Sequence, residues 1–492
     1  EARARLVRAV SDARVVVEGG MTNKGFLLDV LEHPEFRSGG VTTSWLDGTS
    51  LAAAPAPTIE ALIVAAIETY QLERVKVRAN FFAAAARGRP REIPPSSGAE
   101  IDLVYAGQPY RLRVFAIGGW TYRVHSEKSV AQVSLLERGP YSSLLTIGDL
   151  RSQVLVSGSD VEMRVEINGR LHRVLCDVGG KVRAPSPALL IEVAVKPGER
   201  VEVGTRLGIF EAMKTETAFF APVAGVVREV LVRPGERVSA GDVILVIEPV
   251  SGAVVASRSS EALEIPVEDD PLELFRADDG SPDFERASAE PASVRANAVA
   301  SLRGEIRRIL MGYDVNAERA ERLVEVLEAP VAKLSDALRS DLAQLAGAVE
   351  IFSDVETLFS RSPTRISEDE LGPSNDARMA MYLRRIAVLG AGIDPAFLEL
   401  LSKALSHYGI GSLEHSDTLE RAVLRLYATR TTLALRSRLI GALLHLLIGL
   451  GERGEMFARR PELALALDAL SLLRGTVAPS VADLGAQARF LL

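Results

Sequence analysis

Hydrophobic and polar positions along the chain first follow a helical period. From Thr58 onward, apolar side chains recur at intervals of three and four residues, namely Ile59, Leu62, Ile63, Ala66, Ile67 and Tyr70. This spacing predicts one long amphipathic helix that starts at the N-cap Thr58 and runs to about Phe82. A stretch rich in Arg, Pro and Gly at 87–98 then ends the pattern.

Between residues 100 and 176 the period changes from 3.6 to 2 residues. Apolar residues alternate with Arg or Thr over 110–114 and over 120–124, where Arg123 takes a polar position. Asn168 and Gly169 end a third alternating run and have the composition of a two-residue hairpin turn. One helix followed by about seven short antiparallel strands predicts a small barrel or curled sheet packed on that helix.

The same strands contain the residues that could bind a metal. His125 and His172 fall in them, but no Cys or carboxylate accompanies either at ligand spacing, so we do not expect a metal site. Cys176 is the single cysteine, which excludes a disulfide framework, and we interpret it as a small buried side chain.

The first 47 residues predict a helix, a short strand over Val15 to Val17, a Gly19–Gly20 turn, a second helix capped by Asn23, and an extended tail. So short a piece cannot enclose a core of its own. We interpret it as the end of another domain. The chain begins in mid-pattern and without Met, which favours a piece of something larger.

Residues 182–249 contain an internal repeat. Ala184–Pro185 recurs 37 residues later as Ala221–Pro222, and the sequence PGERV occurs at 197–201 and again at 234–238. Two copies of a four-strand unit predict a pseudo-twofold β-sandwich, a flattened barrel in which each PGERV forms the same turn and Gly supplies the positive φ. The hairpin that joins the copies carries Met213 and Lys214 at its tip.

A lone lysine in a turn is usually a solvated charge, but this one lies at the symmetric end of a predicted rigid domain. Lysine has a long stem and an amine that can be acylated. A hairpin tip leaves that amine accessible to a modifying enzyme, while the sandwich beneath it stays rigid. Ala212, Met213 and Lys214 therefore predict a covalent carrier site.

The remaining chain divides into a linker and a helical region. Residues 251–295 are rich in Ser, Pro and acidic residues, which is typical of a linker and predicts that the carrier moves relative to the helical region. From 296 to 492 the pattern predicts about ten helices without strands. The most apolar run, 439–451, is 13 residues long, while a bilayer span needs about 20, so it predicts a buried helix.

Composition excludes several classes of function. The net charge of −8 argues against a nucleic-acid partner. No signal peptide opens the chain, and a single cysteine fits a cytoplasmic protein with no membrane partner. The sequence has neither a glycine-rich phosphate loop with lysine nor a G-x-G-x-x-G after a strand, so we expect no complete active site and no catalytic residues here.

The sequence EAMKTE, within its repeated frame, resembles the biotinyl domain of biotin-dependent carboxylases. The resemblance implies that Lys214 carries covalent biotin, that Ala212 and Met213 complete the attachment motif, and that a biotin protein ligase is a partner. This chain has Thr215 where the family usually has Met, and Ala188 follows Pro187 where Pro-Gly is usual.

The flanking regions resemble parts of the same enzymes. Residues 21–47 are similar to the last segment of biotin carboxylase domains, and 58–176 to the mediator (BT) domain of acyl-CoA carboxylases. The helical region, with ILMGYDV at 309–315, is similar to the central region of single-chain acetyl-CoA carboxylases. The resemblance implies the end of a biotin carboxylase domain at 1–50, a BT domain at 51–180, a biotinyl (BCCP) domain at 181–250, a linker at 251–295 and a helical central domain at 296–492.

By this resemblance the parent is a multidomain ligase of the acetyl- or propionyl-CoA type, as in fatty acid biosynthesis. It would carboxylate biotin with ATP, Mg²⁺ and bicarbonate and pass the carboxyl group to an acyl-CoA. The partners implied are the biotin carboxylase and carboxyltransferase domains of the parent chain, in a homo-oligomer. The central helices would hold the two catalytic parts at a spacing that the carrier can cross.

Two other interpretations stay open. The first is a lipoyl-type carrier, which usually has Asp-Lys-Ala at this turn, whereas Met213 before the lysine favours biotin. The second is a non-catalytic helical interaction protein whose barrel is unmodified. Intact mass after co-expression with a biotin ligase separates the three.

Overall fold

The computed structural model describes the chain in two compact units. The residues described are 1–492 apart from 18–21, 49–56, 89–92, 95, 127–128, 159–161, 177–179, 185, 213–214, 222, 240–241, 250–269, 278, 332–333, 361–373, 387–391, 451–460, 474–476 and 492. One unit comprises Glu1–Tyr70, Glu100–Val114 and Val124–Val267, and the other comprises Gln71–Ala99, Phe115–Arg123 and Glu268–Leu492.

The N-terminal segment is helical throughout its regular parts, namely α1 (Ala2–Asp12), α2 (Lys24–Glu32), α3 (Pro34–Ser38) and α4 (Trp45–Gly48). The strand predicted over Val15 to Val17 is wrong, because the nearby barrel is closed and offers no sheet edge for pairing. The predicted extended tail instead contains α3 and α4. Asn23 occupies the N-cap of α2, but its side chain makes no capping hydrogen bond with any described residue.

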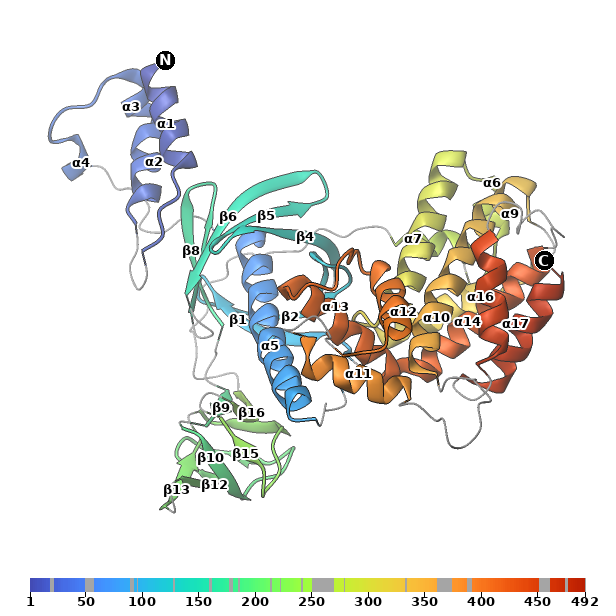
Figure 1. The fold of residues 1–492 in the computed structure, drawn as a ribbon. Coiled ribbons are helices and arrows are strands. Elements are labelled where there is room, and N and C mark those ends of the chain that lie inside the picture. Colours follow the sequence, from blue (N-terminus) through green and yellow to red (C-terminus); the bar gives the residue numbers. More distant parts are fainter. Residues whose placement is uncertain are drawn as a thin grey trace. The chain divides into compact units, whose positions relative to one another are not determined.

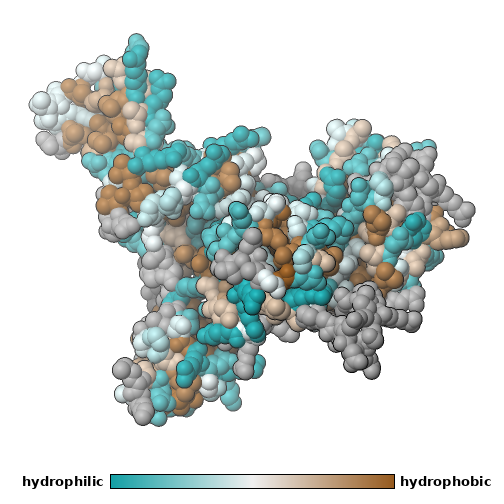
Figure 2. Space-filling view, viewed as in Figure 1, coloured by the Kyte–Doolittle hydropathy of each residue, from teal (hydrophilic) through white to brown (hydrophobic). Residues whose placement is uncertain are grey.

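A buried lysine ties this segment to the barrel. Lys24 Nζ donates to Glu166 Oε1 at 2.7 Å and to the carbonyl oxygens of Ala13 at 2.6 Å and Ser11 at 2.9 Å. Lys24 and Glu166 are both buried, so each compensates a charge that would otherwise be costly away from water. Apolar side chains stay exposed on these helices (Figure 2), Phe26 and Leu46 among them.

Eight strands form a closed barrel, and the long helix α5 (Ile59–Ala86) runs among them (Figure 1). The strands are β1 (Ala99–Tyr105), β2 (Gln108–Ala116), β3 (Thr121–His125), β4 (Val130–Gly139), β5 (Ser142–Ile147), β6 (Leu150–Gly158), β7 (Glu162–Ile167) and β8 (Arg170–Leu175). Every residue from Ala61 to Ile67 is buried, so this part of α5 is covered on all faces and not along one stripe. The predicted helix-plus-barrel is therefore present, with one strand more than expected.

The hairpin predicted at Asn168 and Gly169 is confirmed. Ile167 pairs with Arg170 across the turn, and Asn168 and Gly169 have φ of 50° and 82°. Two consecutive positive φ angles define the turn whose twist matches that of antiparallel strands.

His172 in β8 and Cys176 directly after that strand are both buried, and the sequence predicted this for Cys176. His172 Nδ1 lies 2.7 Å from the hydroxyl of Tyr105. That hydroxyl accepts a hydrogen bond from Thr58 N, so its own proton is free to be donated to His172. Burial, helped by the positive charge of Arg170, lowers the pKa of His172 to about 4.

The region predicted as the biotinyl sandwich consists of two four-stranded sheets, with strand orders β13-β12-β10-β15 and β11-β14-β16-β9. The strands are β9 (Lys181–Arg183), β10 (Ala188–Val193), β11 (Arg200–Val201), β12 (Arg206–Ala212), β13 (Thr215–Phe220), β14 (Gly225–Val230), β15 (Arg237–Val238) and β16 (Val243–Pro249). Side chains from both sheets form one apolar core that includes Leu190, Phe210 and Ile247.

The second unit is helical beyond residue 270, as predicted. Its described helices are η1 (Pro271–Phe275), α6 (Glu285–Ala289), α7 (Ala292–Leu310), α8 (Ala317–Leu327), α9 (Asp336–Ala343), η2 (Gln344–Ala346), α10 (Gly347–Phe359), α11 (Asn375–Arg384), α12 (Pro395–Ser406), α13 (Asp417–Ala428), η5 (Thr429–Thr432), α14 (Leu433–Leu450), α16 (Pro461–Ser471) and α17 (Pro479–Leu491).

The linker predicted over 251–295 is wrong in its second half. Residues 250–269 lie outside the described residues, but η1 and α6 are folded parts of the helical core. Phe275 and Phe284 are buried, with ring centroids 5.9 Å apart. Two large aromatic side chains bury enough apolar surface to order a segment whose composition is otherwise polar.

The apolar run at 439–451 falls in α14, whose leucines lie in the core of the helical unit. In the part of the chain that the structure describes, 417–450 is the one helical stretch long and apolar enough to cross a bilayer, and 56% of its most apolar window is buried. Core helices pass the same test. This stretch also contains Arg436, which is fully buried and donates to Glu356 Oε1 at 2.5 Å and to Leu310 O at 3.1 Å.

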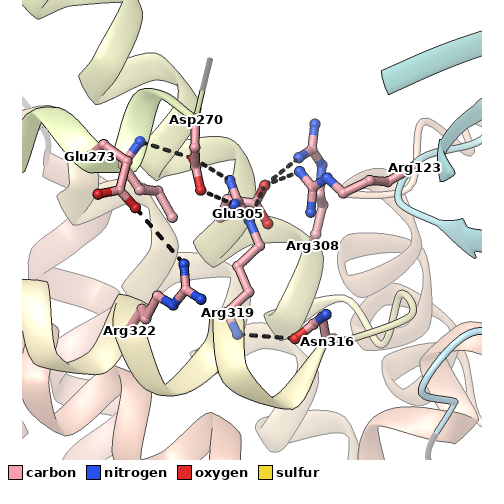
Figure 3. Close-up of polar contacts among 9 residues, drawn as sticks. Arg123, Asp270, Glu273, Glu305, Arg308, Asn316, Arg319 and Arg322 are labelled. Atoms are coloured by element: carbon pink, nitrogen blue, oxygen red, sulfur yellow. Dashed lines mark hydrogen bonds and ion pairs between the residues drawn. The ribbon is translucent and has the colours of Figure 1, made fainter. Parts of the chain in front are cut away.

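Arg123 departs from the predicted alternation, because it is buried rather than exposed. Its guanidinium pairs with Glu305 of α7, which also pairs with Arg308 at 3.0 Å and Arg319 at 3.2 Å (Figure 3). Burial opposes ionisation of Glu305, but Arg123 and Arg319 outweigh it and lower the pKa of this carboxyl. Arg319 also binds Asp270, the N-cap of η1, with Nη2 2.9 Å from Oδ1. The sequence shows the charge at 123 but not the partner that permits its burial.

We expect Glu68→Gln to stabilise the barrel at alkaline pH. Burial, and then the charge of Glu137, raise the pKa of Glu68 from 4.5 to about 7. Between these values the folded chain retains a proton that the unfolded chain has lost, so stability falls as pH rises through this window. The variant, which carries no charge, should gain up to about 3 kcal/mol at pH 8 and little at pH 5.

Thermal or urea unfolding of both proteins at several pH values measures this difference. Glu60→Gln, which removes a carboxylate from the same helix, is the control. A stability difference that is equal at pH 5 and pH 8 would contradict the assignment.

Candidate functional site

The predicted carrier site lies where β12 and β13 meet. Ala212 pairs with Thr215, and Glu211 pairs with Glu216, so the two strands stay in register to the last described residue on each side. Met213 and Lys214 lie outside the described residues. The structure therefore locates the predicted attachment motif through Ala212, which is partly exposed at the end of β12.

Polar and exposed residues surround this end of the hairpin. Thr215, Glu216 and Thr217 are exposed, and Glu211 is partly exposed. Glu211 and Glu216 face each other across the strand pair, and like charges in such positions repel. This pair gives the described end of the hairpin a negative charge.

Close packing beneath the hairpin makes its base rigid. The rings of Phe210 and Phe219 stack with centroids 4.3 Å apart. A Cβ added to Gly208 would lie 2.1 Å from the carbonyl oxygen of Glu192 and 2.7 Å from the ring of Phe219. Position 208 therefore has no room for a side chain, because β12 packs directly against the neighbouring strand β10 and against the ring of Phe219 in β13.

The two PGERV turns have the same conformation and equivalent partners. Gly198 and Gly235 both have φ of 89°. Gly198 N donates to Val227 O, and Gly235 N donates to Leu190 O, each at 2.7 Å. The donors lie 37 residues apart in the sequence, and so do the acceptors. The side chains that accept hydrogen bonds within the turns also correspond, namely Glu199 Oε2 from Lys196 N and Glu236 Oε2 from Arg233 N.

Sequence reasoning missed an ion-pair network in the unit that contains the sandwich and most of the barrel. Arg228 of β14 pairs with Glu100 of β1, and one of its nitrogens lies 4.0 Å from Asp102. Arg111 of β2 pairs with Asp102 at 2.7 Å and with Glu248 of β16 at 3.1 Å. The alternation around Arg111 predicted its polar face, but nothing local in the sequence shows its partners.

These ion pairs are weak individually. Their side chains are between 26% and 49% exposed, and exposed pairs contribute about 0–1 kcal/mol each and are screened by salt. The network joins strands of the sandwich to strands of the barrel through these pairs. No cluster of three or more His, Cys, Asp or Glu suited to a metal ion occurs within the described ranges.

We expect Gly208→Ala to destabilise the sandwich by about 1–3 kcal/mol, because its Cβ would force the strands or Phe219 to move. Hydrogen exchange of peptides from β12 and β13, read by mass spectrometry, should speed up. Gly139→Ala in the barrel is the control, because a Cβ there meets nothing within 4 Å. Unchanged exchange in Gly208→Ala would show that the hairpin base is not closely packed.

Comparison with known proteins agrees with this geometry. Residues 175–247 match the family model described as biotin-requiring enzyme, a range that includes most of the two-sheet domain. This match supports covalent biotin as the cofactor of the domain.

Longer matches reach beyond the sandwich. The chain is 24% identical over 391 residues to acetyl-CoA carboxylase of Saccharomyces cerevisiae, covering 75% of this chain and 15% of that protein. It is 25% identical over 250 residues to the propionyl-CoA carboxylase alpha chain of Ruegeria pomeroyi, covering 47% and 37%. A match to acetyl-CoA carboxylase 1 of Arabidopsis thaliana is 24% identical over 216 residues and covers 42% and 9%. The chain thus spans a minor part of each of these relatives.

Proposed function

We propose that this chain is the carrier and scaffold region of a multidomain acyl-CoA carboxylase, and that Lys214 carries biotin through an amide bond. The observation that carries the proposal is the register of Ala212 with Thr215. It leaves the two residues Met213 and Lys214 to join paired strands at one end of the domain that matches biotin-requiring enzymes.

The residues around position 214 fit such a group. Attachment joins the Nζ amine of Lys214 to the carboxyl group of biotin with net loss of water, and removes the lysine charge. Biotin, when attached, supplies the nitrogen that takes up and gives up a carboxyl group. The exposed Thr215 and Thr217 leave space for a biotin protein ligase, and the stacked Phe210 and Phe219 keep the base of the hairpin fixed.

The equivalent turns at Gly198 and Gly235 support a second part of the proposal, that the carrier is a pseudo-twofold repeat of one four-strand unit. A symmetric sandwich closes both sheets against one core. The joining hairpin then lies at one end of a stiff body, where a bound group can reach partners without disturbing the fold.

We also propose the division implied by the resemblance. Residues 1–50 end a biotin carboxylase domain, 51–180 are the BT mediator and 181–250 the carrier. The exposed apolar side chains Phe26 and Leu46 suit a segment that packs against further protein. The helices to 492 are the central scaffold. The connection after the carrier is bounded by Pro249 and Asp270, because η1 is folded, and fully extended it spans at most about 70 Å.

Carboxylation and transfer then occur on biotin carboxylase and carboxyltransferase domains of the parent chain, in a cytoplasmic homo-oligomer that acts on acetyl- or propionyl-CoA. The carrier moves between these sites. The exposed ion pairs of Arg228 and Arg111 support such movement, because contacts of about 0–1 kcal/mol each break readily.

We expect Lys214→Arg to abolish biotinylation. Arginine keeps the charge but has no amine that a ligase can acylate. Intact mass and streptavidin binding, after co-expression with a biotin ligase, measure the result. Lys196→Arg, at an exposed lysine of the same sandwich, is the control and should be biotinylated like the parent. A lipoyl mass at Lys214, or no added mass on the unaltered chain, would refute the biotin assignment.

We expect Arg228→Glu to free the sandwich from the barrel, because it would put like charges beside Glu100 and Asp102. Small-angle scattering at low salt should show a broader distribution of interatomic distances than in the parent. Raising the salt to about 1 M should move the parent toward the variant. Arg206→Glu is the control, because Arg206 pairs with Glu192 of the same sandwich and not with the barrel. Identical profiles for all three proteins would argue against reversible docking.

A further inference from the structure

A cavity of about 420 Å³, open to solvent, lies on the surface of the helical unit. Its wall includes Arg307, Arg308 and Tyr313 at the end of α7, His407 after α12, and the glycines at 118 and 304. This volume is in the range of sites that take small organic molecules. The described residues that line it all belong to the helical unit.

Arg307 contributes a positive charge without a matching carboxylate. Its Nη2 donates to the carbonyl oxygen of His407 at 2.6 Å, and its Nε lies 3.3 Å from Met311 Sδ. Both partners are neutral, and no carboxylate oxygen among the described residues pairs with this guanidinium. An anion in the cavity would therefore be attracted to Arg307.

Arg308 adds a second guanidinium whose counter-ion is shared. Its Nη1 donates to Glu305 Oε1 at 3.0 Å, but the same carboxylate also pairs with Arg123 and Arg319 (Figure 3). Asp270 pairs with Arg319, so three guanidiniums share two carboxylates. These five groups together therefore carry one net positive charge. Burial lowers the pKa of Arg308; Glu305 opposes this shift, and the charges of Arg123 and Arg319 add to it.

The nearby carboxylates are already engaged elsewhere. Asp354 pairs with Lys403 at 2.8 Å and with His407 Nε2 at 2.9 Å. Asp314, next to Tyr313, accepts from Ala116 N at 2.9 Å. The contacts given for these two carboxylates are with groups other than Arg307 and Arg308.

Gly304 lines the cavity without filling it, because it has no side chain. Glycine inside a helix costs about 0.5–1 kcal/mol relative to alanine, so its place in α7 calls for a reason. Close packing is not the reason for a glycine here, because an added Cβ would meet only the tip of Arg308, at 3.9 Å. The absence of a side chain leaves space beside that guanidinium.

We propose that this cavity binds a small organic phosphate, with Arg307 and Arg308 at the phosphate group and the ring of Tyr313 along the apolar part of the ligand. Guanidinium groups match phosphate oxygens in two-point contacts and hold them more strongly than neutral donors do. The site uses neither Lys214 nor the hairpin. An experiment that refutes this site therefore does not refute the function proposed for the carrier, and the reverse also holds.

Titration calorimetry of the full chain at low salt tests the proposal, with phenyl phosphate and inorganic phosphate as probes. Phenyl phosphate should bind more tightly than inorganic phosphate, since only it contacts the Tyr313 ring. Arg307→Gln and Arg308→Gln should each weaken its binding about tenfold or more, as loss of a charged hydrogen bond implies. Arg303→Gln, an exposed arginine on the same helix, is the control and should bind like the parent.

Gly304→Leu provides a second variant that keeps both arginines and improves helix propensity. It should fold with at least the parent's thermal stability and lose phenyl phosphate binding, because its side chain enters the cavity. Three results would overturn the proposal: no saturable binding to the parent, equal weakening by Arg303→Gln and Arg307→Gln, or full binding by folded Gly304→Leu.

Discussion

The register between β12 and β13 is the constraint on which the proposed carrier depends. Pairing continues to Ala212 and Thr215, and the stacked rings of Phe210 and Phe219 and the missing side chain at Gly208 hold these strands on the rest of the sheet. A slip by one residue would reverse the faces of both strands and remove Phe210 from the core. Core packing therefore sets where β12 and β13 end at Ala212 and Thr215.

Strong and weak contacts are distributed differently within the two units. In the helical unit, Arg436, Glu356 and Glu305 are buried and ion-paired, and removing one partner would leave an uncompensated charge. Where the sandwich meets barrel strands, Arg228 and Glu248 form exposed pairs. The first kind of contact suits the scaffold that we propose, and the second suits the movement that we propose for the carrier.

Secondary structure and turns could be predicted from the sequence, whereas contacts between residues distant in the sequence could not. The long helix, the Asn168–Gly169 turn and the two-sheet domain follow from periodicity, turn composition and a 37-residue repeat, all of which can be read directly from the sequence. Burial of Arg123 depends on Glu305, a residue distant in the sequence. Order in the segment from η1 to α6 depends on Phe275 packing against Phe284. The isolated Val15 to Val17 run lacked a sheet edge, which only the closed barrel reveals. The sequence predicted the position of Ala212 at the hairpin, but it did not predict the ion-pair network of the same unit.

The most direct test of the account is peptide mass spectrometry of the full chain, produced in cells where other biotin carriers are loaded. The account predicts one biotinyl amide, on the peptide that contains residue 214, and none on any other lysine. Biotin on a different lysine, or an unmodified Lys214 beside loaded carriers in the same cells, would contradict it.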